Sequence, residues 1–196
     1  MPESKIVWTV DHEPPFTAFE PTPFKKARPG ESLQIEVNLV AENEGGFRKH
    51  AFVKPNLPNF LTYVVASDEG VIPSKHNYQG EASAPPPLSY FAAGVAFCLM
   101  SHLKAFIYER KLDIRSYTVE QRLVFTRGLA EDAETSGKPG ASCDLFETHV
   151  LVHSDEAADD IKALIEDAQA VCMASVALIN PVPAVTRIQL NGEAIG

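Results

Sequence analysis

The chain has 196 residues, of which 45% are hydrophobic and 22% are charged. This composition is ordinary for one globular domain, or for one domain with an appendage. A chain of this length buries roughly 70% of its unfolded surface, so it needs no disulfide or metal to be stable. The formal net charge of −9 disfavours nucleic acids and anionic membrane surfaces as partners. Three cysteines without a visible secretory signal favour the reducing cytoplasm.

The first thirty residues contain six prolines. Because proline lacks a backbone N–H and fixes φ, we expect residues 1–30 to form an irregular arm. Within this arm, Lys5–Val10 is predicted to form a short strand. We expect one domain over residues 31–196.

Residues 31–67 have the pattern of β-structure. Ser32–Glu42 alternates apolar and polar residues, which predicts a strand with one buried face. Asn43, Gly45 and Gly46 form a turn signal, and Phe47–Val53 follows as the second strand of a hairpin. The β-branched and aromatic run Phe60–Ser67 predicts a third strand.

The most apolar stretch begins after three consecutive prolines and predicts a helix over Leu88–Arg110. Its first half is apolar almost all round, which predicts burial on most sides. The stretch approaches membrane-spanning length, but it contains His102 and Lys104. We therefore expect a buried core helix and no membrane span.

The second half of the chain repeats the order of strands followed by a helix. Strands are expected over Asp113–Arg127 and Cys143–His153, with an exposed loop over Gly128–Gly140. Ser154 is the expected N-cap of a second helix. The apolar stripe of that helix comprises Ile161, Leu164, Ile165, Ala168, Val171 and Cys172.

Asn180–Pro183 stops any helix, and Val185–Glu193 is expected to form a final strand. The resulting fold class is α+β.

Cys98 and Cys172 lie in the two helical segments and allow two interpretations. Buried free cysteines are commonly small packing residues. A redox role requires a thiolate, and His102 lies four positions after Cys98, on the same helical face, where its protonated form would favour one. Ser101 is expected on the same side. The residues alone leave both interpretations open.

Other chemistry is not signalled. Cys143 is expected to be a packing residue near the start of its strand. No CxxC pair and no metal-ligand spacing is present, so we expect no metal. His149 pairs with Glu147 on one strand face, which is also typical of a solvated surface. No GxGxxG, GxSxG, HExxH or Walker pattern occurs.

Two segments resemble a known family. Pro86–Cys98 (PPLSYFAAGVAFC) is similar to the central-helix signature of the OsmC/Ohr superfamily, the osmotically inducible protein C and organic hydroperoxide resistance proteins. Ala170–Leu178 (AVCMASVAL) resembles the Cys-Pro-x-Ser-x-x-Leu segment of the same family. The order of elements matches from Glu31 to the end.

The resemblance implies an OsmC-like fold, with antiparallel sheets wrapped around long central helices in an intertwined homodimer. It implies an antioxidant peroxidase active in oxidative stress. Cys98 would attack an organic hydroperoxide, Cys172 would form a disulfide with it, and an external dithiol would reduce that disulfide. No cofactor is implied.

Two positions depart from the family pattern. Leu88 stands ten positions before Cys98, where the peroxidase pattern has a glutamate that holds an arginine against the thiolate. Arg48 is the matching arginine, and Glu81 or His102 is a candidate to replace the glutamate. Met173 replaces the proline after the second cysteine.

An alternative function keeps the fold without catalysis. In it, a small apolar ligand binds at the dimer interface, and the expected lining is Leu88, Phe91, Phe97, Met100 and His102. A third possibility is that all three cysteines only pack.

Overall fold

The computed structural model describes residues 5–72, 78–127, 140–180 and 182–195. It divides into two compact units. The first, called here the sheet unit, comprises residues 1–90 and 127–141. The second, called the helix unit, comprises residues 91–126 and 142–196. The domain boundary expected between residues 30 and 31 stays a prediction.

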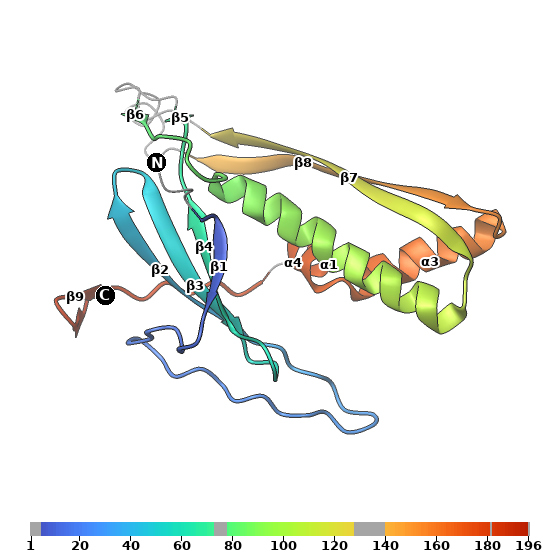
Figure 1. Cartoon of the computed structure of the whole chain (residues 1–196), viewed down its shortest axis with the longest axis horizontal. Coiled ribbons are helices and arrows are strands. Elements are labelled where there is room, and N and C mark those ends of the chain that lie inside the picture. Colours follow the sequence, from blue (N-terminus) through green and yellow to red (C-terminus); the bar gives the residue numbers. More distant parts are fainter. Residues whose placement is uncertain (1–4, 73–77, 128–139, 181, 196) are drawn as a thin grey trace. The chain divides into compact units, whose positions relative to one another are not determined.

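The sheet unit is built on a four-stranded antiparallel sheet with the order β1-β4-β3-β2 (Figure 1). Its strands are β1 (Val7–Val10), β2 (Val37–Gly45), β3 (Arg48–Pro55) and β4 (Thr62–Ser67). Two short strands, β5 (Val71–Ile72) and β6 (Tyr78–Gln79), pair separately. The expected strands in residues 5–67 are therefore confirmed.

The β2–β3 hairpin turns at the predicted glycines. Gly45 and Gly46 adopt φ values of 107° and 57°, a region that glycine enters without a Cβ clash. The Asn43 side-chain oxygen accepts a hydrogen bond from the Gly45 N–H at 2.7 Å. These residues set the register that places Arg48 at the start of β3.

The helix unit holds a long helix, a two-stranded sheet and a second helical segment. Helix α1 (Pro87–Arg110) starts in the sheet unit and continues through the helix unit. The remaining elements are β7 (Ile114–Arg127), β8 (Ala141–Ser154), α3 (Ala158–Val171), α4 (Met173–Ile179), β9 (Gln189–Leu190) and β10 (Glu193–Ala194). The expected loop at 128–140 lies, except for Gly140, outside the described residues.

The core of the helix unit forms where one face of α1 meets α3. Leu99, Leu103 and Ile107 recur every four residues along α1 and are buried. They contact Leu164 and Ala168 of α3, and residues of β7 and β8 complete the cluster. By length and composition alone α1 could span a membrane, and its buried stripe packs into the core of the helix unit.

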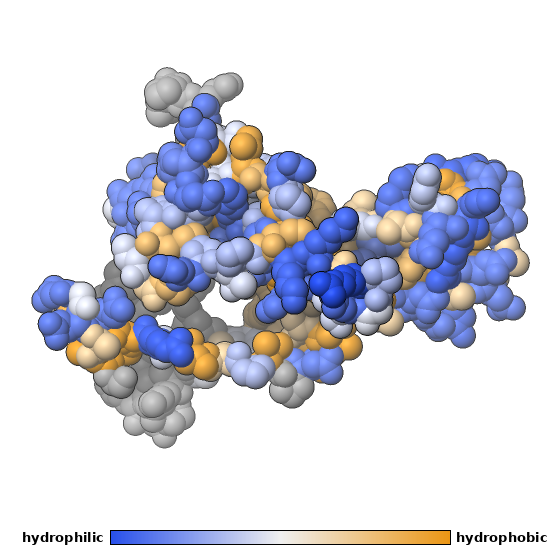
Figure 2. All heavy atoms as spheres, turned by 90° about the horizontal axis from the view of Figure 1, so that it is seen from below, coloured by the Kyte–Doolittle hydropathy of each residue, from blue (hydrophilic) through white to orange (hydrophobic). Residues whose placement is uncertain are grey.

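The expectation that α1 is buried on most sides is wrong for the single chain. Only the stripe that includes Val95 and Leu99 is buried, and 66% of Phe97 and 85% of Tyr108 are exposed. The reason is that α3 and the β7–β8 sheet cover one face of the helix only. Apolar side chains also appear among the polar ones on the surface seen in Figure 2.

Three predictions at the C-terminal side are corrected. Ser154 does not cap α3. It ends β8, its hydroxyl donates to the Asp113 carbonyl at 2.8 Å, and Ala157 is the N-cap residue. The second helix does not run through Cys172, whose extended backbone (φ −71°, ψ 103°) separates α3 from α4. The final strand is reduced to the short β9–β10 pair.

The α1–α3 contact should dominate the stability of the helix unit. Leu164 is 1% exposed, so Leu164→Ala should lower the free energy of unfolding by about 2–5 kcal/mol through lost burial and an internal cavity. Leu190→Ala is the control, because Leu190 is 58% exposed. Urea unfolding followed by circular dichroism measures both, and equal losses would contradict the assigned core.

Candidate active site

The helix unit brings the two helical cysteines together. Cys98 lies on α1 beside the buried Leu99 and is half-buried, whereas Cys172 is fully buried between α3 and α4. Both are free thiols, and Cys172 lies close enough to raise the pKa of Cys98. Two sulfurs distant in the sequence are thus neighbours inside one apolar cluster.

The helix break at Cys172 leaves backbone N–H groups near Cys98 and a hydroxyl bonded to Cys172. Because α4 starts at Met173, the N–H groups of Met173 and Ala174 have no carbonyl partner within that helix. Both N–H groups act on Cys98, where they lower the pKa of the thiol. One residue further, the Ser175 hydroxyl donates to the Cys172 sulfur at 3.2 Å.

Burial raises the pKa of the Cys98 thiol, because an apolar environment disfavours the thiolate. The neighbouring Cys172 raises this pKa as well, and the two backbone N–H groups oppose the rise without overcoming it. Cys98 is therefore a thiol at neutral pH in this structure. A thiolate there needs a positive charge or donors beyond these.

The neighbours of Cys98 along α1 are arranged differently from the expectation. Ser101 is exposed and its hydroxyl donates to the Phe97 carbonyl at 2.9 Å, so it is not directed to the sulfur. His102 is half-buried one turn after Cys98. Its role at the thiol stays a prediction.

Arg48 has its own network in the sheet unit. Its guanidinium donates to Glu44 at 2.8 Å and to the Ser83 hydroxyl at 2.6 Å. Ser83 in turn donates to the carboxylate of Asp68 at 2.7 Å. These groups orient Arg48 within this unit, and the role of Glu81 as the substitute for the missing glutamate stays a prediction.

Asp68 anchors that network although only 1% of its surface is exposed. The Ser83 hydroxyl, followed by the Ser83 N–H, holds the pKa of Asp68 below its usual range, so the buried carboxylate is charged. Gly80 lies against it, and an added Cβ there would come within 2.1 Å of the Glu69 carbonyl oxygen. The close packing around Asp68 therefore requires glycine at position 80.

The residues expected to line an apolar pocket are largely at the surface of the single chain. Leu88, Phe91 and Phe97 are exposed, whereas Met100 is half-buried. Phe91 makes an edge-to-face contact with Phe125, their ring centres 6.2 Å apart. The binding role expected of Leu88, Phe91, Phe97 and Met100 stays a prediction.

The other candidate groups have surface roles. Cys143 is exposed, which corrects the expectation that it packs. Glu147 pairs with Arg122 at 2.8 Å and lies 3.4 Å from His149, which forms a solvated cluster. Among the described residues no group of three or more His, Cys, Asp or Glu side chains is placed to hold a metal ion.

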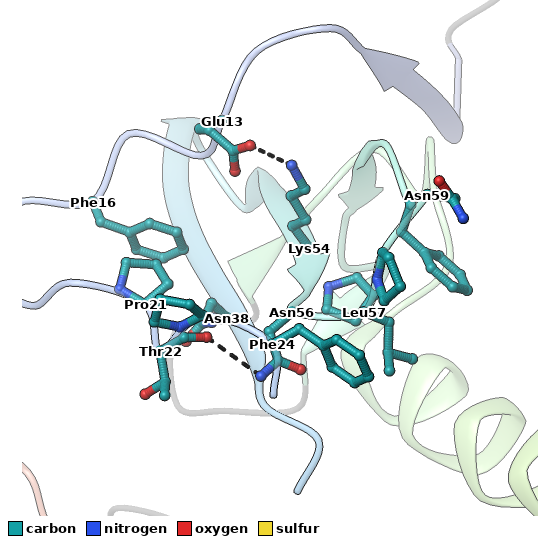
Figure 3. Close-up of a pocket in the computed structure, with 14 residues that line it drawn as sticks. Glu13, Phe16, Pro21, Thr22, Phe24, Asn38, Lys54, Asn56, Leu57 and Asn59 are labelled. Carbon is teal, nitrogen blue, oxygen red and sulfur yellow. Dashed lines mark hydrogen bonds and ion pairs between the residues drawn. The ribbon is translucent and has the colours of Figure 1, made fainter. Parts of the chain in front are cut away.

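A cavity of about 310 Å³ lies in the sheet unit between the N-terminal arm and the β2–β3 hairpin (Figure 3). Two polar pairs cross it: Lys54 with Glu13, and the Asn56 amide with the Thr22 carbonyl. Phe16, Phe24 and prolines supply the apolar lining. The N-terminal arm therefore packs against the sheet around this cavity. None of the predicted site residues lines it.

The family model for OsmC-like proteins matches residues 80–187, which include both helical cysteines. The chain belongs to the OsmC-like family. This confirms the resemblance inferred from the two cysteine segments. The match begins after Arg48, so the assignment of that arginine is not supported by it.

Solved structures agree on the fold. An OsmC-like hydroperoxide resistance protein from Jannaschia sp. CCS1 is 26% identical, with a TM-score of 0.51 over 82% of this chain and 96% of that one. An OsmC-like protein from Vibrio cholerae is 11% identical, with a TM-score of 0.50 over 71% and 91%. The comparison with curated proteins gives no match.

The sequence patterns did not identify three residues that hydrogen-bond to or near the candidate site residues of this OsmC-like protein. Ser175 follows Cys172 at the helical spacing of three, a signal that was available. Asp68 and Ser83 come from separate loops, and no local pattern indicates that they meet. The break at Cys172 was hidden because the apolar pattern continues through it.

A substitution at Met173 tests the donors to Cys98. Met173→Pro removes one N–H at the first position of a helix, where proline is tolerated. We expect the pKa of Cys98 to rise further, and alkylation by iodoacetamide near neutral pH to slow by about threefold or more. Peptide mass spectrometry across a pH series measures the rate at Cys98.

Met173→Ala is the matched control, because it changes the side chain and keeps the N–H. Its alkylation profile should follow wild type, with the half-maximum above the usual thiol value of about 8.5. Identical profiles for the proline and alanine variants would contradict the assigned hydrogen bond.

Proposed function

We propose that this OsmC-like protein reduces organic hydroperoxides with Cys98 as the peroxidatic and Cys172 as the resolving cysteine. The observation that carries the proposal is the pair of free thiols packed together in the core of the helix unit. Membership of the OsmC-like family supports a redox role in general. The Jannaschia protein, similar in fold and 26% identical, is described as a hydroperoxide resistance protein.

The proposed reaction needs two protein sulfurs and an external dithiol. The Cys98 thiolate attacks the terminal oxygen of the hydroperoxide, the O–O bond breaks, and an alcohol leaves with a proton. Cys98 becomes a sulfenic acid. Cys172 then displaces its oxygen as water and forms a disulfide, which the dithiol reduces.

Arg48 is the proposed cation that favours the thiolate, and His102 is the second proposed contributor. Within the sheet unit, Glu44 and Ser83 orient the Arg48 guanidinium, and Asp68 holds Ser83 in place. We propose that they replace the carboxylate that the peroxidase pattern has at position 88. A positive charge at the sulfur would lower the raised pKa of Cys98. The proposal therefore requires that a group outside the helix unit lowers the pKa of Cys98.

We further propose a cytoplasmic homodimer. The apolar side chains of α1 that the single chain leaves exposed, above all Phe97, are the proposed contact surface. Leu88, Phe91 and Met100 are the proposed apolar lining for the hydrocarbon part of the substrate.

A second function has one observation in its favour. The raised pKa of Cys98 is that of an unactivated thiol. An OsmC-like protein with such a thiol could bind a small apolar ligand at the same exposed residues without turning over peroxide.

Cumene hydroperoxide consumption by the reduced protein distinguishes the two functions. Cys98→Ser should abolish it, whereas Cys172→Ser should complete the first step and stop at the sulfenic acid. The wild-type rate should rise with pH as the Cys98 thiolate forms. Stopped-flow spectroscopy measures the rates.

Cys143→Ser is the matched control, because Cys143 is exposed and lies outside the pair. Its rate should equal that of wild type. A wild-type rate no faster than that of a free thiol, together with an apolar molecule retained in native mass spectrometry, would favour the second function.

A charge at Phe97 tests the dimer. Phe97→Glu should convert the dimer to a monomer, because a carboxylate in an apolar interface loses its hydration without a partner. Sedimentation velocity measures the change. Thr118→Glu, at an exposed position of β7, is the control and should leave the assembly intact. A monomeric wild type would contradict the proposal.

A further inference from the structure

We propose that the Ser175 hydroxyl is a catalytic group that holds the sulfur of Cys172 as a thiolate, both when the disulfide forms and when it is reduced. This inference rests on the proposed function and assigns a step within it. It also indicates which sulfur the external dithiol attacks.

The geometry at Ser175 is unusual for a serine in a helix. Such hydroxyls commonly donate to a carbonyl of the preceding turn. Ser101 on α1 does so, with its hydroxyl 2.9 Å from the Phe97 carbonyl oxygen. Ser175 is half-buried and donates instead to the Cys172 sulfur at 3.2 Å.

This hydrogen bond matters because Cys172 has no exposed surface. A buried thiolate loses its hydration, and that loss is costly unless a donor replaces the water. Among the described residues, Ser175 provides the side-chain donor to this sulfur. The Met173 and Ala174 N–H groups act on Cys98 instead, where they lower the pKa of the thiol.

In disulfide formation, Cys172 loses its proton and its sulfur attacks the sulfur of the Cys98 sulfenic acid. The S–S bond forms, the S–O bond breaks, and the departing hydroxide takes up a proton to leave as water. The Ser175 hydroxyl stabilises the negative charge on Cys172 before the bond forms.

In reduction, the same hydrogen bond acts on the leaving group. Cys98 is half-buried and Cys172 is fully buried, so the thiolate of an external dithiol reaches Cys98. A mixed disulfide forms on Cys98, the S–S bond breaks, and its electron pair goes to the Cys172 sulfur. Ser175 donates to that sulfur as it leaves, and the second thiol of the reductant then frees Cys98.

Ser175→Ala tests the assignment in two separate assays. After cumene hydroperoxide is added, consumption of peroxide should stay within twofold of wild type, while the sulfenic acid trapped by dimedone should live about tenfold longer or more. In the second assay, the disulfide is made with diamide, without peroxide, and reduced by dithiothreitol across a pH series. Reduction should also slow about tenfold. The loss should be largest at low pH, where the Cys172 thiolate is a poor leaving group without the hydrogen bond from Ser175.

Two further variants separate catalysis from structure. Ser175→Thr keeps the hydroxyl and should restore both rates. Ser101→Ala removes a hydroxyl that bonds a carbonyl and should leave both rates unchanged. Wild-type rates in Ser175→Ala, or slow rates in Ser175→Thr as well, would overturn the proposal.

Treating the diamide-made disulfide with glutathione shows which of the two sulfurs a thiol attacks. Peptide mass spectrometry should find the glutathione on Cys98, and finding it on Cys172 would overturn the assigned direction. If wild type fails to consume hydroperoxide but Ser175→Ala still slows the dithiothreitol reaction, the proposed function fails and the role of Ser175 stands.

Discussion

The packing of α1 against α3 is the constraint on which the helix unit depends. Leu99, Leu103 and Ile107 project from one face of α1 and bury Leu164 and Ala168 of α3. This contact sets the rotation of both elements, and so it decides that Cys98 meets Cys172. The sulfur pair is therefore a consequence of apolar packing, and its chemistry is placed on a rigid scaffold.

The same packing creates the main electrostatic problem of the site. An apolar cluster that holds two thiols close together also disfavours their ionised forms, and the pKa of Cys98 is raised accordingly. The helix break at Cys172 partly offsets this by turning backbone N–H groups toward Cys98. Met173 contributes one of these donors, which the proline of the family pattern lacks. The residue that departs from the family pattern thus keeps a backbone N–H that lowers the pKa of Cys98.

The sheet unit holds Arg48 through a chain of polar side chains. Leu88 stands where the peroxidase pattern has a carboxylate, and the buried Asp68 holds Ser83, which with Glu44 orients Arg48. Gly80 permits the close packing that this arrangement needs. Under the proposed function, these side chains orient the arginine in place of a carboxylate at position 88.

Periodicity and glycine positions in the sequence determined the α+β class, the β2–β3 hairpin, the strand β4 and the extent of α1, because these are local properties of the backbone. The two cysteine segments were enough for the family. Tertiary structure alone decided the break at Cys172, the exposure of most of α1 and the meeting of Asp68, Ser83 and Arg48. Each of these depends on which residues distant in sequence come into contact, and a local pattern carries no information about such contacts.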